Sequence, residues 1–96
     1  MGVLDGVRIV EIAGIGPGPF CGMLLADMGA EVILVERVSG RAGDPLDMGK
    51  NAILNRGKRS LALDLKDPRA IDAVLRLVER ADALIEGMRP GVMERL

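Results

Sequence analysis

Histidine is absent from this chain of 96 residues, and cysteine occurs once, as Cys21. Without an imidazole the chain can form no histidine-based general acid, catalytic triad or histidine metal site. A lone thiol likewise excludes an internal disulfide and a cysteine-rich zinc site, and neither an HExxH motif nor a calcium-loop motif is present. We therefore expect no metal site and no histidine-based catalysis in these residues.

Aromatic side chains are also scarce, with one Phe, no Tyr and no Trp, although 49% of the residues are apolar and six are Met. Such a core must be aliphatic, which suits helices packed on a parallel sheet. A net charge of −1 argues against a general nucleic-acid or membrane-surface binder. No apolar run approaches the roughly 18–20 residues that span a bilayer, and no signal segment precedes the first apolar run. The expected location is the cytoplasm.

The first part of the chain has the pattern of a β-α-β unit. A β-branched run at 7–13 predicts a strand, and it breaks into the turn sequence GIGPG before a helical run that ends near Gly29. A second strand is predicted at 31–36. Pro17 and Pro19 suit the first turn of a helix, where free N–H groups and the positive dipole end can hold an anionic ligand.

Residues 37–59 lack periodicity and collect Gly, Pro, Asp, Asn and Arg, which predicts a long loop. A third strand is expected at 60–65, followed by a helix with Asp67 as its N-cap and Pro68 at its first position. The buried face of that helix is predicted to consist of Ile71, Val74, Leu75 and Val78.

The chain closes with a short strand at 83–86, a turn at 87–91 and the beginning of a helix at 92–96. These elements predict an α/β fold, a parallel sheet with helices on both faces. Because two whole helices cannot cover both faces, we expect incomplete cover over Ile9, Ile33 and Leu63, and self-association of the chain. The alternative to self-association is a partly ordered chain in which the loop at 37–59 is mobile. The absence of a stop signal at the end suggests a fragment of a larger domain.

Cysteine and three glutamates are assigned structural rather than chemical roles. Cys21 lies in an apolar stretch and is predicted to be a buried thiol. Glu11, Glu36 and Glu86 fall at the ends of predicted strands, where an open α/β sheet collects ligand-facing groups. A charged residue that stops a buried strand is, however, more often a solvated terminus, and we expect that here.

The turn after the first strand partly matches the dinucleotide fingerprint G-x-G-x-x-G. Gly14 and Gly16 fit it, but Pro19 stands where the third glycine lets helix and strand approach closely. Glu36 would be the ribose acid of that fingerprint, whereas Arg37 beside it would pair with a ribose phosphate. The pattern favours a phosphorylated ligand other than NAD.

Basic residues gather near the predicted strand ends. The segment 56–60 has three positive charges beside a glycine and is interpreted either as a solvated turn or as part of a ligand site. In a parallel sheet, the start of the first helix and several basic residues can converge at the carboxyl ends of the strands, where phosphate is commonly bound. These residues are Arg37, Lys58 or Lys66, and Arg89, with Lys66 the better placed lysine.

Three segments together resemble a known family: VRIVEIAGIGPGPFCGMLLADMGAEVILVER, NRGKRSLALDLK and DALIEGMRPGVMERL. They are similar to the N-terminal part of α-methylacyl-CoA racemases, members of the class III CoA-transferase family. The resemblance covers nearly the whole chain. Its ordered motifs GPGPF, GKRS-x-x-LDLK and E-x-x-RPGVMERL are far more specific than a single glycine pattern.

The resemblance implies that residues 1–96 are the N-terminal part of a Rossmann-like large domain that binds the nucleotide half of coenzyme A. It implies an acyl-CoA thioester as ligand, no separate cofactor, and a homodimer whose two chains interlock. The positions that match the family's CoA contacts are Gly16, Pro17, Arg37, Leu63, Asp64, Leu65, Lys66, Gly87, Met88, Arg89 and Arg95. Of these, Arg37 matches the contact to the phosphorylated ribose or adenine end, 63–66 the adenosine contact, and 87–89 the turn near the pyrophosphate.

Within that family, transferases typically carry a glutamine where this chain has Gly16, whereas GIGPGPF is like the racemases. The resemblance therefore implies an isomerase that exchanges the proton α to a thioester carbonyl through an enolate. The histidine, aspartate and glutamate of that reaction lie downstream of the matched region, so no catalytic residue is expected in this chain. Two alternatives stay open: CoA transfer between carboxylic acids, and a non-catalytic nucleotide-binding module.

Overall fold

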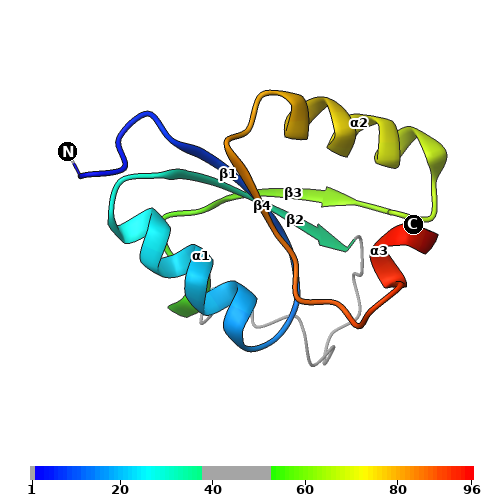
Figure 1. The fold of residues 1–96 in the computed structure, drawn as a ribbon, viewed down its shortest axis with the longest axis horizontal. Coiled ribbons are helices and arrows are strands. Elements are labelled where there is room, and N and C mark those ends of the chain that lie inside the picture. The colour runs from blue at the N-terminus through cyan, green and yellow to red at the C-terminus, as the bar shows by residue number, and fades with distance from the viewer. Residues whose placement is uncertain (1, 38–52) are drawn as a thin grey trace.

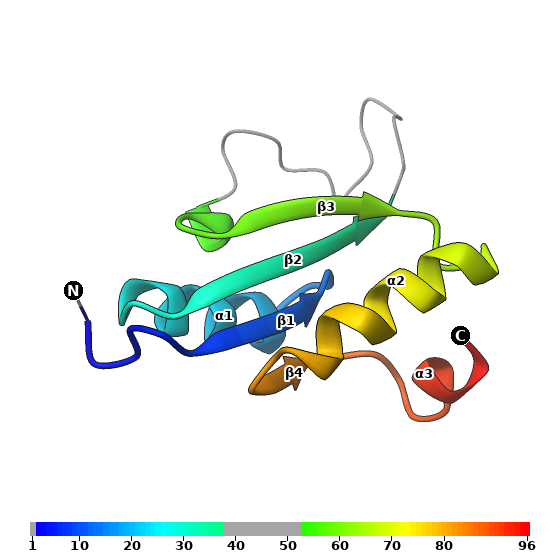
Figure 2. The ribbon, with the colours of Figure 1, turned by 90° about the horizontal axis from the view of Figure 1, so that it is seen from above.

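The computed structural model describes residues 2–37 and 53–96. Within these ranges a four-stranded parallel sheet has the order β3-β2-β1-β4 (Figure 2). Its strands are β1 (Arg8–Ile12), β2 (Glu31–Arg37), β3 (Arg59–Leu63) and β4 (Ala83–Ile85). Helix α1 (Pro17–Asp27) lies on one side of the sheet and α2 (Pro68–Glu79) on the other (Figure 1). The predicted α/β class, with helices on both faces, is confirmed.

Strand β1 is central and divides the core into two layers by the alternation of its side chains. Ile9 packs with Ala30 and Val32 against the second half of α1. On the opposite face, Val10 and Ile12 pack with residues of α2 and of the short helix α3 (Val92–Arg95). Glu11 therefore falls on the α1 face of the sheet, beside the aliphatic cluster around Ile9.

Glycine and proline fix both ends of α1, as the sequence predicts. Pro17 occupies the first helical position, and the N-cap Gly16 has φ 90° and ψ −124°, a conformation open to glycine but strained for other residues. At the other end, Gly29 has φ 103°. Its N–H donates to the Ala26 carbonyl at 3.0 Å, which turns the chain into β2.

Helix α2 begins as predicted, because the Asp67 carboxylate accepts a hydrogen bond from the Arg69 N–H at 2.9 Å. Its predicted buried face is correct for Val74 and Val78, which pack on the sheet. The prediction is wrong for Leu75, which is 57% exposed. Leu77 takes its place in the core.

The third strand ends two residues earlier than predicted. Strand β3 covers Arg59–Leu63, so Asp64 and Leu65 belong to the turn that leads to α2. Of the predicted loop at 37–59, Arg37 is the last residue of β2, and Ile53–Asn55 form a single 3-10 turn, η2, beside α1. Residues 38–52 of that loop lie outside the described residues.

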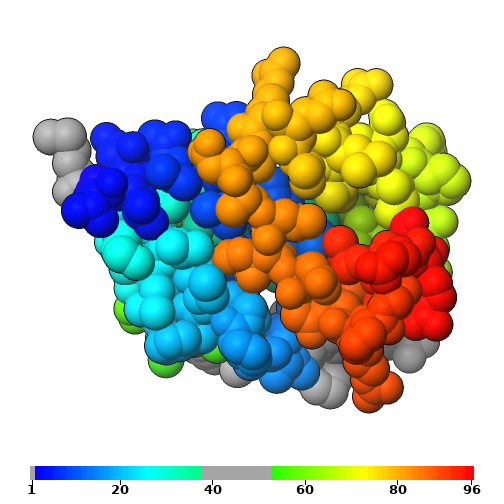
Figure 3. All heavy atoms as spheres, in the orientation of Figure 1, coloured from blue at the N-terminus to red at the C-terminus, as the bar shows by residue number. Residues whose placement is uncertain are grey.

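The predicted gaps in the cover of the sheet are confirmed at Ile33 and Leu63, which are half-buried. The prediction is wrong for Ile9, which is only 4% exposed. The edge strand β4 is also open, with Leu84 42% exposed, and this strand lies at the surface between α1 and α3 (Figure 3). Within the described ranges, no helix has both the length and the apolar character needed to cross a bilayer.

Candidate functional site

The predicted site residues gather along one edge of the molecule. Because the strands are parallel, the segments that follow them leave the sheet at the same carboxyl edge (Figure 2). Gly16 and Pro17 follow β1, Arg37 ends β2, and Leu63 ends β3. The turn after β3 contains Asp64, Leu65 and Lys66, the segment after β4 contains Gly87, Met88 and Arg89, and Arg95 lies on α3.

A topological switch lies at this edge between β1 and β4. The segment after β1 enters α1 on one face of the sheet, whereas the segment after β4 leads to α3, whose Met93 packs into the core on the α2 face. The first turn of α1 approaches β4 closely, since a Cβ on Gly18 would lie 3.8 Å from Ile85 Cγ2. Open α/β sheets bind ligands at such a switch point.

The apolar members of the predicted set have their side chains in the core. Leu63, Leu65 and Met88 all pack in the layer formed by Val10, Ile12 and Val35. These side chains are partly buried in that layer, so their backbone groups are the polar groups that they can offer to a ligand.

The basic members of the set are exposed at this edge. Arg37, Lys66, Arg89 and Arg95 all have exposed side chains, and none of them pairs with an acidic side chain from the described part of the chain. Arg37 follows Val35 at the two-residue period of a strand, so it falls on the face that α2 and α3 cover.

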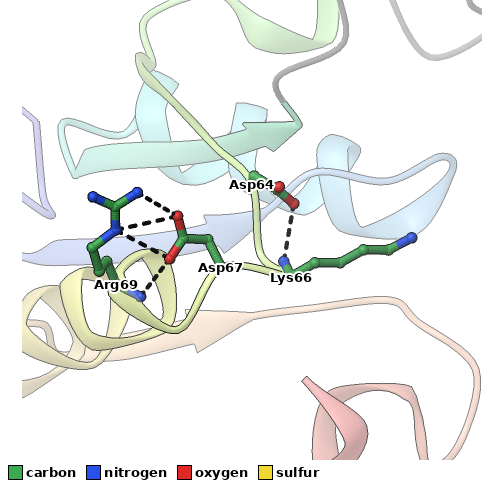
Figure 4. A network of polar contacts seen from close by, with 4 residues as sticks. All are labelled: Asp64, Lys66, Asp67 and Arg69. Atoms are coloured by element: carbon green, nitrogen blue, oxygen red, sulfur yellow. Dashed lines mark hydrogen bonds and ion pairs between the residues drawn. The ribbon is translucent and has the colours of Figure 1, made fainter.

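The turn between β3 and α2 keeps the Lys66 ammonium free (Figure 4). The Asp64 carboxylate accepts a hydrogen bond from the Lys66 N–H at 3.0 Å, which shapes the turn. Asp67 is engaged by Arg69, whose guanidinium lies 2.9 Å away and lowers the pKa of the Asp67 carboxyl. The Lys66 side chain extends away from both carboxylates and is available to an anion.

The start of α1 offers fewer donors than a helix N-terminus usually does. Among its first three positions, Pro17 and Pro19 have no N–H, and only Gly18 keeps one. The Phe20 N–H is already used, since it donates to the Gly16 carbonyl at 3.3 Å. The positive end of the helix dipole remains, but the expected anion site is reduced to one backbone amide in this turn.

Two sequence interpretations, of Glu11 and Lys58, are wrong because these residues form a buried ion pair. Lys58 Nζ lies 2.8 Å from Glu11 Oε1, and the two side chains are 1% and 0% exposed. Lys58 also donates to the Pro19 carbonyl at 3.1 Å. Burial raises the pKa of Glu11, and the neighbouring Lys58 offsets only part of that effect. Lys58 is thus removed from the candidate ligand-binding edge, and Glu11 is no solvated strand end.

Gly22 is a residue that the sequence analysis missed. A Cβ on Gly22 would overlap the Glu11 carboxylate, at 2.9 Å from Cδ, and would lie 3.1 Å from Lys58 Cε. This glycine lets α1 approach β1 closely, the role that the dinucleotide pattern gives to the position of Pro19. A glycine inside a predicted helix, where it lowers stability relative to alanine, is the signal that points to such a contact.

The other charged groups singled out from the sequence have local partners. Glu36 accepts a hydrogen bond from Ser60 Oγ, and exposed Glu86 accepts one from the Met88 N–H at 2.9 Å. Arg56 pairs with Asp27 at the last residue of α1, far from the carboxyl edge, with 2.6 Å between Nη2 and Oδ2. The basic segment at 56–60 therefore contributes no side chain to the candidate site.

Two further points concern reactive groups. Cys21 is exposed, so the prediction of a buried thiol is wrong: it faces outward from α1 while Gly22 and Met23 face the sheet. The described residues contain no cluster of His, Cys, Asp or Glu that could hold a metal ion.

Comparison with known proteins agrees with this architecture. The chain is 54% identical over 94 residues to the α-methylacyl-CoA racemase of Mus musculus and 44% identical over 106 residues to the succinyl-CoA:mesaconate CoA-transferase of Haloarcula hispanica. These alignments cover 98% and 99% of this chain but only 23% and 27% of the two relatives. The crystal structure of a CAIB/BAIF family protein from Brucella suis matches with a TM-score of 0.83 and 36% identity, over 98% of this chain and 28% of that protein. The model of CoA-transferase family III matches residues 4–96, and the chain belongs to that family.

Proposed function

We propose that these residues form the CoA-binding N-terminal part of an α-methylacyl-CoA racemase, an isomerase of 2-methyl-branched acyl-CoA thioesters. The chain spans about a quarter of the length of these relatives, so the proposed activity is that of a longer protein. The substrate carries its own CoA, and no other cofactor is required.

The charge at the carboxyl edge supports a CoA ligand. Coenzyme A presents a 3′-phosphate and a pyrophosphate. At this edge Arg37 ends β2, while Lys66 and Arg89 follow β3 and β4, and all three side chains are exposed. Guanidinium groups bind phosphate oxygens in pairs, whereas the Lys66 ammonium acts as a point charge. We assign Arg37 to the 3′-phosphate end, 63–66 to adenosine, and Gly87, Met88 and Arg89 to the pyrophosphate, with Arg95 as a further basic contact.

The backbone of Gly16 is the observation that favours a racemase over a transferase. At φ 90° this position is strained for any residue with a Cβ, and a Cβ here would meet no atom within 4 Å. The constraint is therefore conformational rather than steric. Transferases of the resembled family typically carry a glutamine at this position, so a glycine with this backbone conformation supports the racemase proposal.

The residue types in this chain indicate which steps of the proposed reaction it can support. Removal of the proton α to a thioester carbonyl needs an acid/base pair on each side of the carbon, and this chain has no histidine to supply one. Its own contribution is to hold the nucleotide end of CoA, which fixes where the thioester lies. The acid and base come from the remainder of the protein.

CoA transfer between carboxylic acids is the second candidate. It is favoured by the 44% identity to a succinyl-CoA:mesaconate CoA-transferase over nearly the whole chain. In either case we infer a homodimer, because α1 and its C-cap residue present the exposed apolar side chains Phe20, Leu24 and Met28 at four-residue spacing. A helix that is apolar on its outer side is suited to burial against another surface.

Isotope exchange separates the two activities. The longer protein is incubated in D₂O with a 2-methylacyl-CoA, with and without a second carboxylic acid, and the products are analysed by mass spectrometry. A racemase incorporates a single deuterium at the α carbon and leaves CoA on its original acyl group. Transfer of CoA to the added acid without α-deuteration would replace the proposal by the transferase.

A further inference from the structure

The ion pair between Glu11 and Lys58 differs from the other ion pairs of the described residues because both of its side chains are buried, and the proposed CoA site does not use it. Glu11 lies in the central strand β1, and Lys58 comes from the segment just before the edge strand β3. Both side chains are almost completely removed from solvent, with Lys58 Nζ 2.8 Å from Glu11 Oε1. No other donor among the described residues reaches either oxygen of the Glu11 carboxylate.

A buried ion pair adds little net free energy to the stability of a core. Removing two charges from water costs about as much as their attraction returns, and an apolar pair of similar volume often packs as well or better. The pair also requires Gly22 inside α1, because a Cβ there would overlap the Glu11 carboxylate. The stability of the core alone therefore does not account for these three residues.

An apolar pair would lack the second polar contact of the lysine. Lys58 Nζ donates to the carbonyl of Pro19 at 3.1 Å, and Pro19 lies in the first turn of α1. Two residues earlier, Pro17 begins the helix, and Gly16 adopts its unusual backbone conformation. Glu11 in β1 thus binds the Lys58 ammonium, and that ammonium in turn binds the first turn of α1.

Alternative anchors for the turn are weak. Its N-cap has no side-chain hydrogen bond, because Gly16 has no side chain. Pro17 and Pro19 supply no N–H that the preceding loop could bind. On the opposite side, even a Cβ added to Gly18 would reach Ile85 only at ordinary van der Waals distance. Among residues 2–37 and 53–96, the Lys58 hydrogen bond is the polar side-chain contact that ties the turn to another element.

We propose that Glu11 and Lys58 are positioning residues for the CoA site, holding the first turn of α1 so that Gly16 and Pro17 keep their place at the carboxyl edge. This inference rests on the proposed CoA-binding function. Neither residue touches the ligand, and both act through the backbone of Pro19.

The test separates positioning from stability. In the longer protein, Glu11→Leu combined with Lys58→Met replaces the pair by apolar side chains, which restores packing but removes the contact to Pro19. We expect global stability near that of the unmodified protein, faster hydrogen exchange of the Phe20 amide, and CoA affinity lower by about tenfold, the scale of one hydrogen bond to a charged group. Unchanged exchange at Phe20 with unchanged affinity would overturn the proposal.

A second variant keeps the test decisive if the double variant does not fold. Glu11→Gln retains an acceptor for Lys58, so the lysine stays on Pro19, and we expect Phe20 exchange and CoA affinity within about twofold of the unmodified protein. Faster Phe20 exchange or weaker CoA binding in this variant would overturn the proposal, because it would mean that the charge of Glu11, and not the contact to Pro19, matters. Ile9→Ala is the matched control, because Ile9 is buried on the same strand and face but packs against the second half of α1.

The readouts also distinguish failure of this inference from failure of the proposed function. Hydrogen exchange of the Phe20 amide needs no ligand. If the unmodified protein does not bind CoA, the proposed function fails, while faster exchange at Phe20 in the double variant still supports the anchoring role of Lys58.

Discussion

Gly22→Ala provides a direct test of the close packing between α1 and β1. Inside a helix, alanine is more favourable than glycine by about 0.5–1 kcal/mol, so the substitution would ordinarily stabilise the protein. Here the added Cβ would overlap the Glu11 carboxylate and would stand 3.1 Å from Lys58 Cε. Overpacking a core costs about 1–3 kcal/mol, and separating a buried ion pair costs about 3–5 kcal/mol.

The expected net result is a loss of unfolding free energy between about 1 and 4 kcal/mol, since the gain in helix propensity offsets only part of the overlap. Removing the obstruction should reverse the sign. In a protein that already carries Glu11→Ala and Lys58→Met, Gly22→Ala should raise the unfolding free energy by about 0.5–1 kcal/mol.

Urea unfolding followed by far-ultraviolet circular dichroism measures these differences, because the chain has no Trp or Tyr to report by fluorescence. Gly18→Ala is the matched control: it lies in the same helix, but its Cβ would meet only Ile85 Cγ2, at 3.8 Å. We expect a neutral or slightly stabilising effect there. A Gly22→Ala protein that unfolds at the same or a higher urea concentration than the unmodified protein would refute the packing of Glu11 beneath this glycine.

Three further results are expected. Burial raises the pKa of Glu11 above its ordinary value of 4.5, so the contribution of Glu11 protonation to stability is complete below pH 4.5 and is lost as pH rises through the folded-state pKa. Thermal unfolding measured across this pH range should show the loss of stability with rising pH, and Glu11→Ala with Lys58→Met should remove it. Leu75→Ala should change the unfolding free energy by less than about 0.5 kcal/mol, and Leu77→Ala should lower it by about 1–3 kcal/mol; equal effects in urea unfolding would contradict the orientation of α2. Sedimentation of the chain should depend on concentration, and Leu24→Lys should weaken that dependence, whereas a concentration-independent unmodified monomer would exclude association through α1.

Local signals carried most of the fold prediction. Pro17 begins α1, Asp67 and Pro68 begin α2, and Gly29 ends α1, because each of these residues acts on the backbone within a few positions of itself. The parallel order and the gathering of Arg37 and Lys66 at one edge then follow from the β-α-β spacing.

The buried ion pair was beyond such reasoning. Glu11 and Lys58 are distant in sequence, and each one alone has the pattern of a solvated charge beside a turn. Only the crossing of α1 over the sheet brings them together, and only Gly22 makes room for them. The sequence shows the glycine but does not indicate which residues it lies against.

The faces of the helices were the other source of error. Helix α2 has apolar residues at adjacent positions, so a shift in its rotation about its own axis exchanges Leu75 for Leu77, and the choice depends on contacts with β1 and β2. Helix α1 is apolar on both sides, so periodicity could not show that Cys21 faces outward.

Calorimetric titration with CoA and with 3′-dephospho-CoA tests the central claim most directly, that the carboxyl edge of this sheet binds the nucleotide end of CoA. Arg37→Ala should weaken CoA binding by about 1.5–3 kcal/mol and should weaken 3′-dephospho-CoA binding less, because the lost contact is to the 3′-phosphate. Arg56→Ala, which removes an exposed arginine paired with Asp27 away from that edge, should leave both affinities unchanged. Equal losses for the two ligands would move Arg37 away from the 3′-phosphate, and unchanged CoA binding by Arg37→Ala would contradict a CoA site at this edge.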